Sequence, residues 1–176
     1  MSINLLENVL EDIKLGKFVI VVDDEDRENE GDLVMASQLI TPEAVNFMVK
    51  EARGLICVSI TEEKSKFLNL ETMAKNNTSL HETNFTVSVD AAKNTTTGIS
   101  TKDRCETIKV LANKTSKADD LVRPGHIFPI ISKEGGTLRR AGHTEASVDL
   151  AKMAGLEPVS YTHLRAHETV LDLVCR

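Results

Sequence analysis

The sequence predicts an α/β or α+β fold, with a mixed central sheet flanked by helices in a single domain. Three observations support this fold class. Short apolar runs that are typical of strands alternate with helical patterns along the chain. Neither an internal repeat nor a linker-like stretch divides the 176 residues, a length that suffices for one buried core. The content of 41% hydrophobic and 27% charged residues is ordinary for a globular protein.

The first predicted elements are a helix and two strands. The segment "INLLENVLEDIKLGK" places Leu5, Val9 and Ile13 at helical spacing and ends at Gly16, which predicts a helix. In "KFVIVV" every residue after Lys17 is apolar, so we expect a strand that is buried on both faces. After an acidic stretch, "DLVMAS" predicts the second strand.

The middle of the chain begins with a well-capped helix. In "TPEAVNFMVKEARG", Thr41 is the expected N-cap, Pro42 stands at the first helical position and Gly54 lies just past the end. The segments that follow predict a strand at "LICVSI", a long polar loop at "ETMAKNNTSLHETN" and an alternating strand at "FTVSVD".

Two more helices and a strand are predicted towards the C-terminus. In "TTTGISTKDRCETIKVLAN" a polar turn leads into a helix, with Ser100 as the expected cap. We expect a turn followed by a strand in "LVRPGHIFPIIS" and a hairpin or loop in "GGTLRRAGH". The segment "TEASVDLAKMAG" then predicts a helix that ends at Gly155.

Composition argues against several classes of partner. Aromatic residues make up 3% of the chain, Trp is absent and the net charge is −6, so we expect no nucleic-acid partner. Cys57, Cys105 and Cys175 are odd in number, far apart and without a CxxC pair, which indicates a reducing compartment and no structural zinc. Because neither a signal peptide nor a membrane-length apolar stretch occurs, we expect a cytoplasmic protein without a membrane partner.

The segment "DDEDRENEGD" (residues 23–32) holds seven carboxylates and one arginine. Charge runs usually form solvated faces, but this run follows a buried strand, and Arg27 stands beside Glu28. Carboxylate oxygens are the ligands that magnesium-type ions prefer. A calcium-binding EF-hand loop starting at Asp26 would need a Glu at its twelfth position, which is Ser37. A solvated edge and a divalent-metal site therefore both remain open.

Two histidine segments carry further candidate chemistry. "RPGHIFP" (residues 123–129) places His126 between turn residues and an apolar strand, a setting in which histidine is more often packed and hydrogen-bonded. In "RRAGHTEA" (residues 139–146), two arginines precede His143 and Thr144 opens a helix. A helix start with nearby arginines indicates a phosphate site, and His143 could ligate a metal there. A surface turn is the alternative.

These motifs together resemble one family. "DDEDRENEGD", "TTGIS", "RPGHIFP" and "RAGHTEASVDLAKMAG" occur in the order found in the 3,4-dihydroxy-2-butanone 4-phosphate synthases of riboflavin biosynthesis. The resemblance runs from about residue 5 to about Pro158. It implies an α/β sandwich and a lyase that converts D-ribulose 5-phosphate into 3,4-dihydroxy-2-butanone 4-phosphate and formate. It also implies Mg²⁺ or Mn²⁺ as cofactor, and a homodimer with active sites near the subunit interface.

The resemblance also implies roles for particular residues. His126 corresponds to the essential histidine, and Asp32 to a proton acceptor or hydroxyl anchor. Glu28 and His143 correspond to metal ligands. Residues 76–86 and 95–104 are expected to form loops that close over the substrate. The implied substrate-binding residues are Arg27, Glu28, Asp32, Arg140, Ala141, Gly142, His143 and Thr144.

The family pattern breaks after "AGLEP", so we expect a synthase domain at residues 1–158 and a non-family tail at 159–176. In the family a Gly-Val strand ends there in a catalytic Glu, and gapless alignment places that Glu on Leu164. The tail resembles translated sequencing-adapter DNA, which suggests that the natural C-terminus was lost near Pro158. We expect the tail to pack poorly or to form a short unrelated helix through Leu164, Val170, Leu171 and Val174.

Glu168 is the one tail carboxylate that a four-residue slip would bring to the position of the family's Glu. Without such a carboxylate, one acid/base group of the family is missing. The sequence therefore supports two functions, the synthase itself and a non-catalytic phosphosugar- and metal-binding remnant.

Overall fold

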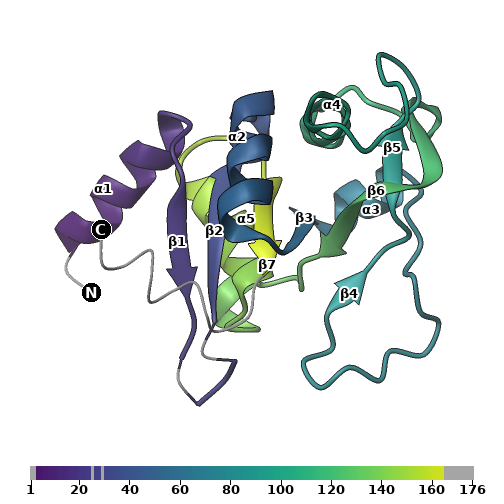
Figure 1. Ribbon diagram of the computed structural model, residues 1–176. Helices are drawn as coiled ribbons and strands as arrows, with labels where there is room; N and C mark the ends of the chain where they lie inside the picture. Colours follow the sequence, from purple (N-terminus) through teal and green to yellow (C-terminus); the bar gives the residue numbers. More distant parts are fainter. Residues whose placement is uncertain (1–2, 25, 29, 165–176) are drawn as a thin grey trace.

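In the described part of the chain, residues 3–24, 26–28 and 30–164, a seven-stranded mixed sheet forms the centre of the computed structural model (Figure 1). Its strands lie in the order β1-β2-β7-β3-β6-β4, and β5 pairs with β6 off this path. The strands are β1 (Val19–Val22), β2 (Gly31–Ala36), β3 (Leu55–Ile60), β4 (Asn84–Phe85), β5 (Val89–Ala91), β6 (Leu121–Ile131) and β7 (Ser160–Leu164). The β3–β6 pair is parallel and the other pairs are antiparallel, which confirms the predicted mixed sheet.

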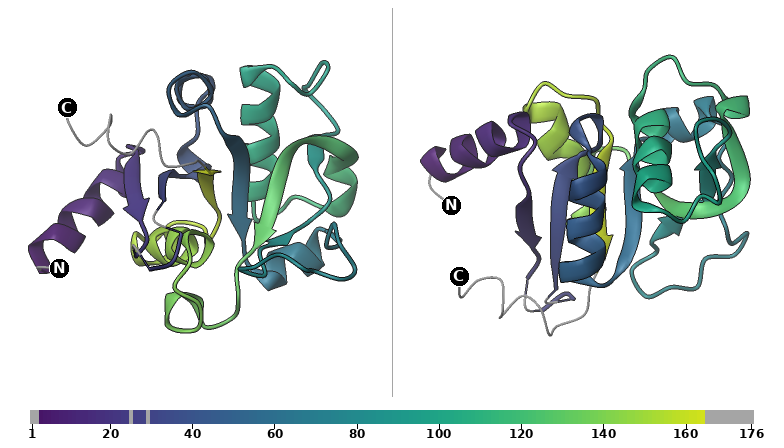
Figure 2. Two further views of the ribbon diagram at one scale, coloured as in Figure 1. Left: turned by 60° about the horizontal axis from the view of Figure 1, so that its bottom comes forward. Right: turned by 45° about the horizontal axis from the view of Figure 1, so that its top comes forward.

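Helices cover both faces of this sheet, as Figure 2 shows for α2 and α5 on opposite sides. The larger core packs α2 and α4 against the alternate residues of β2 and β3 that include Leu33 and Ile56. A smaller core around Ile13 and Ala36 joins α1 to the other face, near the end of α5. None of the described helices is long and apolar enough to cross a membrane. The helices are α1 (Ile3–Lys14), α2 (Pro42–Phe47), α3 (Glu62–Phe67), α4 (Thr101–Ala112) and α5 (His143–Met153).

The prediction that the first strand is buried on both faces is wrong. β1 is an edge strand whose neighbour in the sheet is β2. Along it, Ile20 and Val22 remain 40% and 54% exposed. A continuous apolar run indicates burial on both faces only where other elements cover the strand on both sides, and position within the sheet is not visible in the run itself.

The predicted helix caps are confirmed. Thr41 accepts a hydrogen bond from the Ala44 N–H, 3.1 Å, and Ser100 accepts one from the Asp103 N–H, 3.0 Å. Helix α2 continues as a π-helical turn, η2 (Met48–Ala52). It ends at Arg53, whose φ of 57° is left-handed, one residue before the expected Gly54.

The segment "FTVSVD" contributes to two short strands, β4 and β5, rather than to one, and the pairing of β5 with β6 is itself irregular. Val89 pairs with Ile127, whereas the next residue, Asp90, pairs with Val122. Residues 123–126 therefore project from the ladder inside β6, where the sequence predicted a turn before the strand. At Gly125 the two strands approach so closely that a Cβ atom would lie 2.0 Å from the Val89 carbonyl carbon, which requires glycine.

The expectation that the tail packs poorly or forms a helix is wrong for its first residues. Ser160–Leu164 form β7, which pairs with β2 on one side and β3 on the other. Val159, just before it, is 2% exposed. Val170, Leu171 and Val174 of the expected helix lie outside the described residues. The sheet therefore has no unpaired edge between β2 and β3.

Candidate active site

The acidic loop between β1 and β2 is organised around Asp23. The Asp23 carboxylate is 6% exposed and accepts hydrogen bonds from the N–H groups of Glu30 (2.9 Å) and Glu28 (3.2 Å). Arg27 donates to it from Nη1 at 2.6 Å. Burial alone would raise the pKa of Asp23, but these hydrogen bonds and the nearby His143 outweigh it, and the pKa is lowered. Asp23 therefore stays ionised at neutral pH and fixes the shape of the loop.

Arg27 partly neutralises this loop from within. Its guanidinium contacts the Asp23 carboxylate and also Glu28 Oε1, at 3.0 Å. The side chain is 19% exposed. The carboxylates are thus held together by an internal cation, in addition to any bound metal, and the loop is not merely a solvated edge.

His143 joins two of these carboxylates from the start of α5. The side chain is 4% exposed, with Nε2 3.8 Å from Asp23 Oδ1 and Nδ1 3.9 Å from Glu28 Oε2. One ligating atom from each of the three residues lies within 4.8 Å of the others. Two carboxylates and an imidazole suit a divalent ion such as Mg²⁺ or Mn²⁺. The structure thus brings the predicted Glu28 and His143 together.

Sequence reasoning assigned no role to Asp23, although the residue stands in the acidic motif. The one clue to its role in the sequence is its position, because Asp23 is the first residue after β1. His81 was also missed. It comes from the polar loop before β4, and its Nε2 lies 3.7 Å from Glu28 Oε1. Part of the 76–86 segment therefore reaches the candidate site.

Asp32 lies on β2 beside this cluster and is fully buried. Neither carboxylate oxygen has a hydrogen-bond partner among the described residues. Burial, reinforced by the charges of Glu30, Glu28 and Asp23, raises the pKa of Asp32 to about 8. A carboxyl with that pKa can hold a proton and release it near neutral pH.

Cys57 on β3 shares this environment. Burial, with the charge of Asp32 as a second cause, raises the pKa of its thiol well above the usual value. Because the thiolate is the reactive form of cysteine, Cys57 is poorly suited to act as a nucleophile.

The predicted phosphate segment forms the start of α5. Arg140 donates to Glu145 Oε2 at 2.6 Å and to the His81 carbonyl at 2.9 Å, so its guanidinium is held at the helix start. The N-cap is Gly142, so no side chain caps the first turn. A Cβ atom on Gly142 would lie 2.4 Å from Arg140 Nη1. His143 and Thr144 are buried in this first turn, whereas Ala141 is exposed.

His126 is not part of this cluster within one chain. It lies in the bulge of β6, and β7 and β3 stand between β6 and β2. Three strand spacings separate β2 from β6 by about 14 Å. Its Nδ1 instead lies 2.8 Å from Oδ2 of Asp90, another residue that sequence reasoning did not single out.

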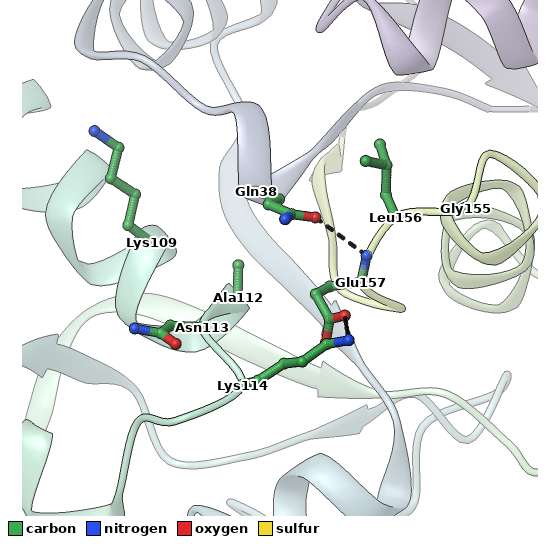
Figure 3. Close-up of a pocket in the computed structure, with 8 residues that line it drawn as sticks. All are labelled: Gln38, Lys109, Ala112, Asn113, Lys114, Gly155, Leu156 and Glu157. Carbon is green, nitrogen blue, oxygen red and sulfur yellow. Dashed lines mark hydrogen bonds and ion pairs between the residues drawn. The ribbon is translucent and has the colours of Figure 1, made fainter.

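A cavity of about 570 Å³ lies at the opposite end of β2 from the acidic loop. Figure 3 shows its lining, in which Gln38 accepts a hydrogen bond from the Glu157 N–H and Lys114 pairs with the Glu157 carboxylate at 2.7 Å. The cavity contains no residue of the acidic loop or of the α5 start. Size alone therefore does not identify the candidate site.

The fold and this donor set place the chain among α/β sandwich domains that can hold a divalent metal at the start of a helix. Within that class, the chain belongs to the 3,4-dihydroxy-2-butanone 4-phosphate synthase family, whose model matches residues 7–171. This confirms the resemblance drawn from the motifs.

Two relatives show the extent of the match. The riboflavin biosynthesis protein RibBA of Chlorobium phaeovibrioides is 58% identical over 167 residues, which cover 94% of this chain and 41% of that protein. The 3,4-dihydroxy-2-butanone 4-phosphate synthase of Pseudomonas aeruginosa is 54% identical over 158 residues, covering 90% and 43%. The chain thus spans about two fifths of the length of these curated relatives.

Solved structures agree with the fold. A crystal structure of 3,4-dihydroxy-2-butanone 4-phosphate synthase in complex with two magnesium ions has a TM-score of 0.88 and 40% identity, covering 93% of this chain and 78% of that one. RibBX, a two-domain synthase from A. baumannii, has a TM-score of 0.89 and 43% identity, covering 97% and 52%. The predicted α/β sandwich is therefore confirmed.

Proposed function

We propose that the chain is a lyase of riboflavin biosynthesis that converts D-ribulose 5-phosphate into 3,4-dihydroxy-2-butanone 4-phosphate and formate. The observation that carries the proposal is the grouping of Asp23, Glu28 and His143 at the start of α5, in a chain of this family. This grouping places a divalent-metal site beside a phosphate site at the helix start. Binding and activating a phosphorylated ketose would use both sites.

Asp23, Glu28 and His143 would hold Mg²⁺ or Mn²⁺, in line with the two magnesium ions in the related structure. When bound, the ion polarises the ketose carbonyl and its neighbouring hydroxyl, which makes the adjacent carbon more acidic. Arg27 keeps Asp23 and Glu28 in place when the site changes charge. Its own role in substrate binding, implied by the family, would use the remaining N–H groups of its guanidinium.

The start of α5 would bind the phosphate of the substrate. Helical N–H groups of the first turn have no side-chain cap, and the positive end of the helix dipole lies there. Arg140 adds a cation held in position by Glu145. The Ala141–Gly142 backbone lets an anion approach this turn, and the Thr144 hydroxyl lies in the same turn. A phosphate anchored there fixes the register of the sugar.

Proton transfer would fall to Asp32 and His126. Asp32 is buried beside the metal ligands, with a pKa of about 8, so it can accept a proton from carbon or anchor a hydroxyl. His126 is too distant within one chain. A homodimer in which His126 of a second copy completes the site would supply it. Two such groups suit the successive proton transfers of enolisation, dehydration and rearrangement.

Formate release tests the proposal. The 176-residue chain is incubated with D-ribulose 5-phosphate and MgCl₂, formate is measured by a coupled dehydrogenase assay, and the phosphorylated product is identified by ¹³C NMR. We expect equal amounts of the two products, and their loss when EDTA is added. Metal-dependent binding of the sugar phosphate without formate would refute the proposal.

That outcome is the one expected from the second candidate function, a phosphosugar- and metal-binding domain without catalysis. The observation that favours it is the end of β7. Leu164, the position of the family's C-terminal Glu, pairs with Leu55 there, and leucine can neither take nor give a proton. We accordingly propose residues 1–158 as the family domain and 159–176 as a replaced C-terminus. Replacing Leu164 with Glu should then raise formate release.

A further inference from the structure

The bulge of β6 places two backbone N–H groups outside the sheet ladder. Residues 123–126 are extra with respect to β5, because pairing moves from Val89–Ile127 to Asp90–Val122. Extra residues in a bulge lose their ladder partners, so their N–H groups bond to other acceptors. Two side chains near β5 provide it. Ser88 Oγ accepts from the Gly125 N–H at 3.1 Å, and Asp90 Oδ1 accepts from the His126 N–H at 2.9 Å.

Asp90 does more than satisfy the backbone. Its second oxygen, Oδ2, lies 2.8 Å from Nδ1 of the His126 ring. The Asp90 side chain is 10% exposed, whereas the His126 side chain is 40% exposed. One carboxylate therefore holds both the backbone and the ring of the same histidine. In the described part of the chain, Nε2 of His126 makes no hydrogen bond.

We infer that Asp90 is a positioning residue that fixes the tautomer and the orientation of His126. A carboxylate oxygen beside Nδ1 accepts a hydrogen bond from an N–H group at that position. The ring hydrogen therefore stays on Nδ1, and the lone pair stays on Nε2. Nε2 is then the nitrogen that accepts a proton from the substrate. The inference rests on the proposed function, in which His126 transfers protons.

The Thr/Gly-rich turn before α4 closes over this pair. Gly98 has a φ of 85°, and a Cβ atom on it would lie 1.9 Å from Asp90 Oδ2 and 2.7 Å from His126 Nδ1. Asp103, which is 3% exposed, holds the turn by accepting from the N–H of Gly98 (3.1 Å) and from Thr96 Oγ1 (2.8 Å). The glycine backbone packs against the carboxylate and limits its contact with water, which strengthens the Asp90–His126 hydrogen bond.

Two substitutions separate this role from backbone support. In Asp90→Asn, the amide oxygen can still accept the His126 N–H, but the NH₂ group faces Nδ1. The ring must then accept at Nδ1 and carry its hydrogen on Nε2. Ser88→Ala removes the acceptor of the neighbouring Gly125 N–H and leaves the ring untouched. It is therefore the matched control for loss of bulge support alone.

The first measurement is ¹⁵N NMR of the histidine rings in the free protein, with His126→Gln used to assign the signals. We expect the hydrogen of His126 on Nδ1 in the unsubstituted chain and in Ser88→Ala, and on Nε2 in Asp90→Asn. This readout needs no catalysis. If the chain releases no formate, the proposed function fails while the tautomer still decides the positioning role.

The second measurement is steady-state formate release. We expect kcat of Asp90→Asn to fall by about 10²–10⁴-fold, the scale of tautomer loss in a carboxylate–histidine pair, with KM nearly unchanged. Ser88→Ala should keep both parameters close to those of the unsubstituted chain. Gly98→Ala, which pushes the carboxylate from the ring without changing charge, should lower kcat as well. A hydrogen that remains on Nδ1 in Asp90→Asn, or an unchanged kcat, would overturn the inference.

Discussion

Replacing Asp32 with Asn should change how stability depends on pH. The pKa of Asp32 is raised from 3.8 to about 8 in the folded protein. Between these values the native state holds a proton that the unfolded chain has released. The free energy of unfolding therefore falls as pH rises from about 4 to about 8. At about 1.4 kcal/mol per pH unit, the whole effect reaches about 6 kcal/mol.

The variant carries no ionisable group at this position, so its stability lacks this decline. Relaxation of the folded protein around the charge makes 6 kcal/mol a ceiling, and we expect the difference between Asp32→Asn and the unsubstituted chain to grow by about 2 kcal/mol or more from pH 5 to pH 8. Urea unfolding followed by circular dichroism in EDTA measures it at each pH. Exposed Asp26, changed to Asn, is the control on the same loop.

Magnesium provides a second test of the same reasoning. A cation held by Asp23, Glu28 and His143 offsets the negative charges that act on Asp32, so saturating Mg²⁺ should reduce the pH-dependent difference. A difference between Asp32→Asn and the unsubstituted chain that stays constant from pH 5 to pH 9 would show that Asp32 ionises as an exposed carboxyl does. The argument from its burial would then be wrong.

Three further outcomes are expected. Glu28→Ala and His143→Ala should each abolish formate release and weaken Mg²⁺ binding measured by calorimetry, and near-normal turnover at low Mg²⁺ would contradict the metal site. Arg140→Ala should raise KM for D-ribulose 5-phosphate, since a charge-assisted contact of about 1.5–3 kcal/mol is lost; an unchanged KM would place the phosphate elsewhere. Mixed and reassociated His126→Gln and Glu28→Ala chains should regain about a quarter of normal turnover, because half the dimers then hold one intact site. Continued inactivity of dimers shown to be mixed would refute a shared site.

Local signals in the sequence were sufficient for much of the fold. The caps at Thr41 and Ser100 form because a hydroxyl bonds an N–H three residues away, an interaction that neighbouring residues alone determine. The edge position of β1 and the bulge in β6 depend on which strands become neighbours. Neither is encoded in the segment itself, so the continuous apolar run at residues 18–22 indicated burial on both faces that the structure does not provide.

The candidate site likewise has features that the local sequence predicts and features that depend on contacts between distant residues. The acidic motif and the start of α5 were recognisable as segments, and the structure brings Glu28 and His143 together. Within the motif the carboxylates look alike, and only the folded loop shows that Asp23 turns inward to His143. The pairing of Asp90 with His126 joins positions 36 residues apart. No local pattern reports such a contact. The roles of Arg27, Asp32, Arg140 and His126 in catalysis remain predictions.

The placement of β7 has a consequence for biosynthesis. The strand joins β2 to β3, yet it is made after every other strand of the sheet. Until the ribosome releases residues 160–164, the nascent chain carries two strand edges facing a gap that nothing earlier in the chain fills. Such edges pair readily with other chains. Efficient production should therefore depend on the interval between synthesis of β3 and emergence of residues 160–164, and on chaperones that shield those edges in the meantime.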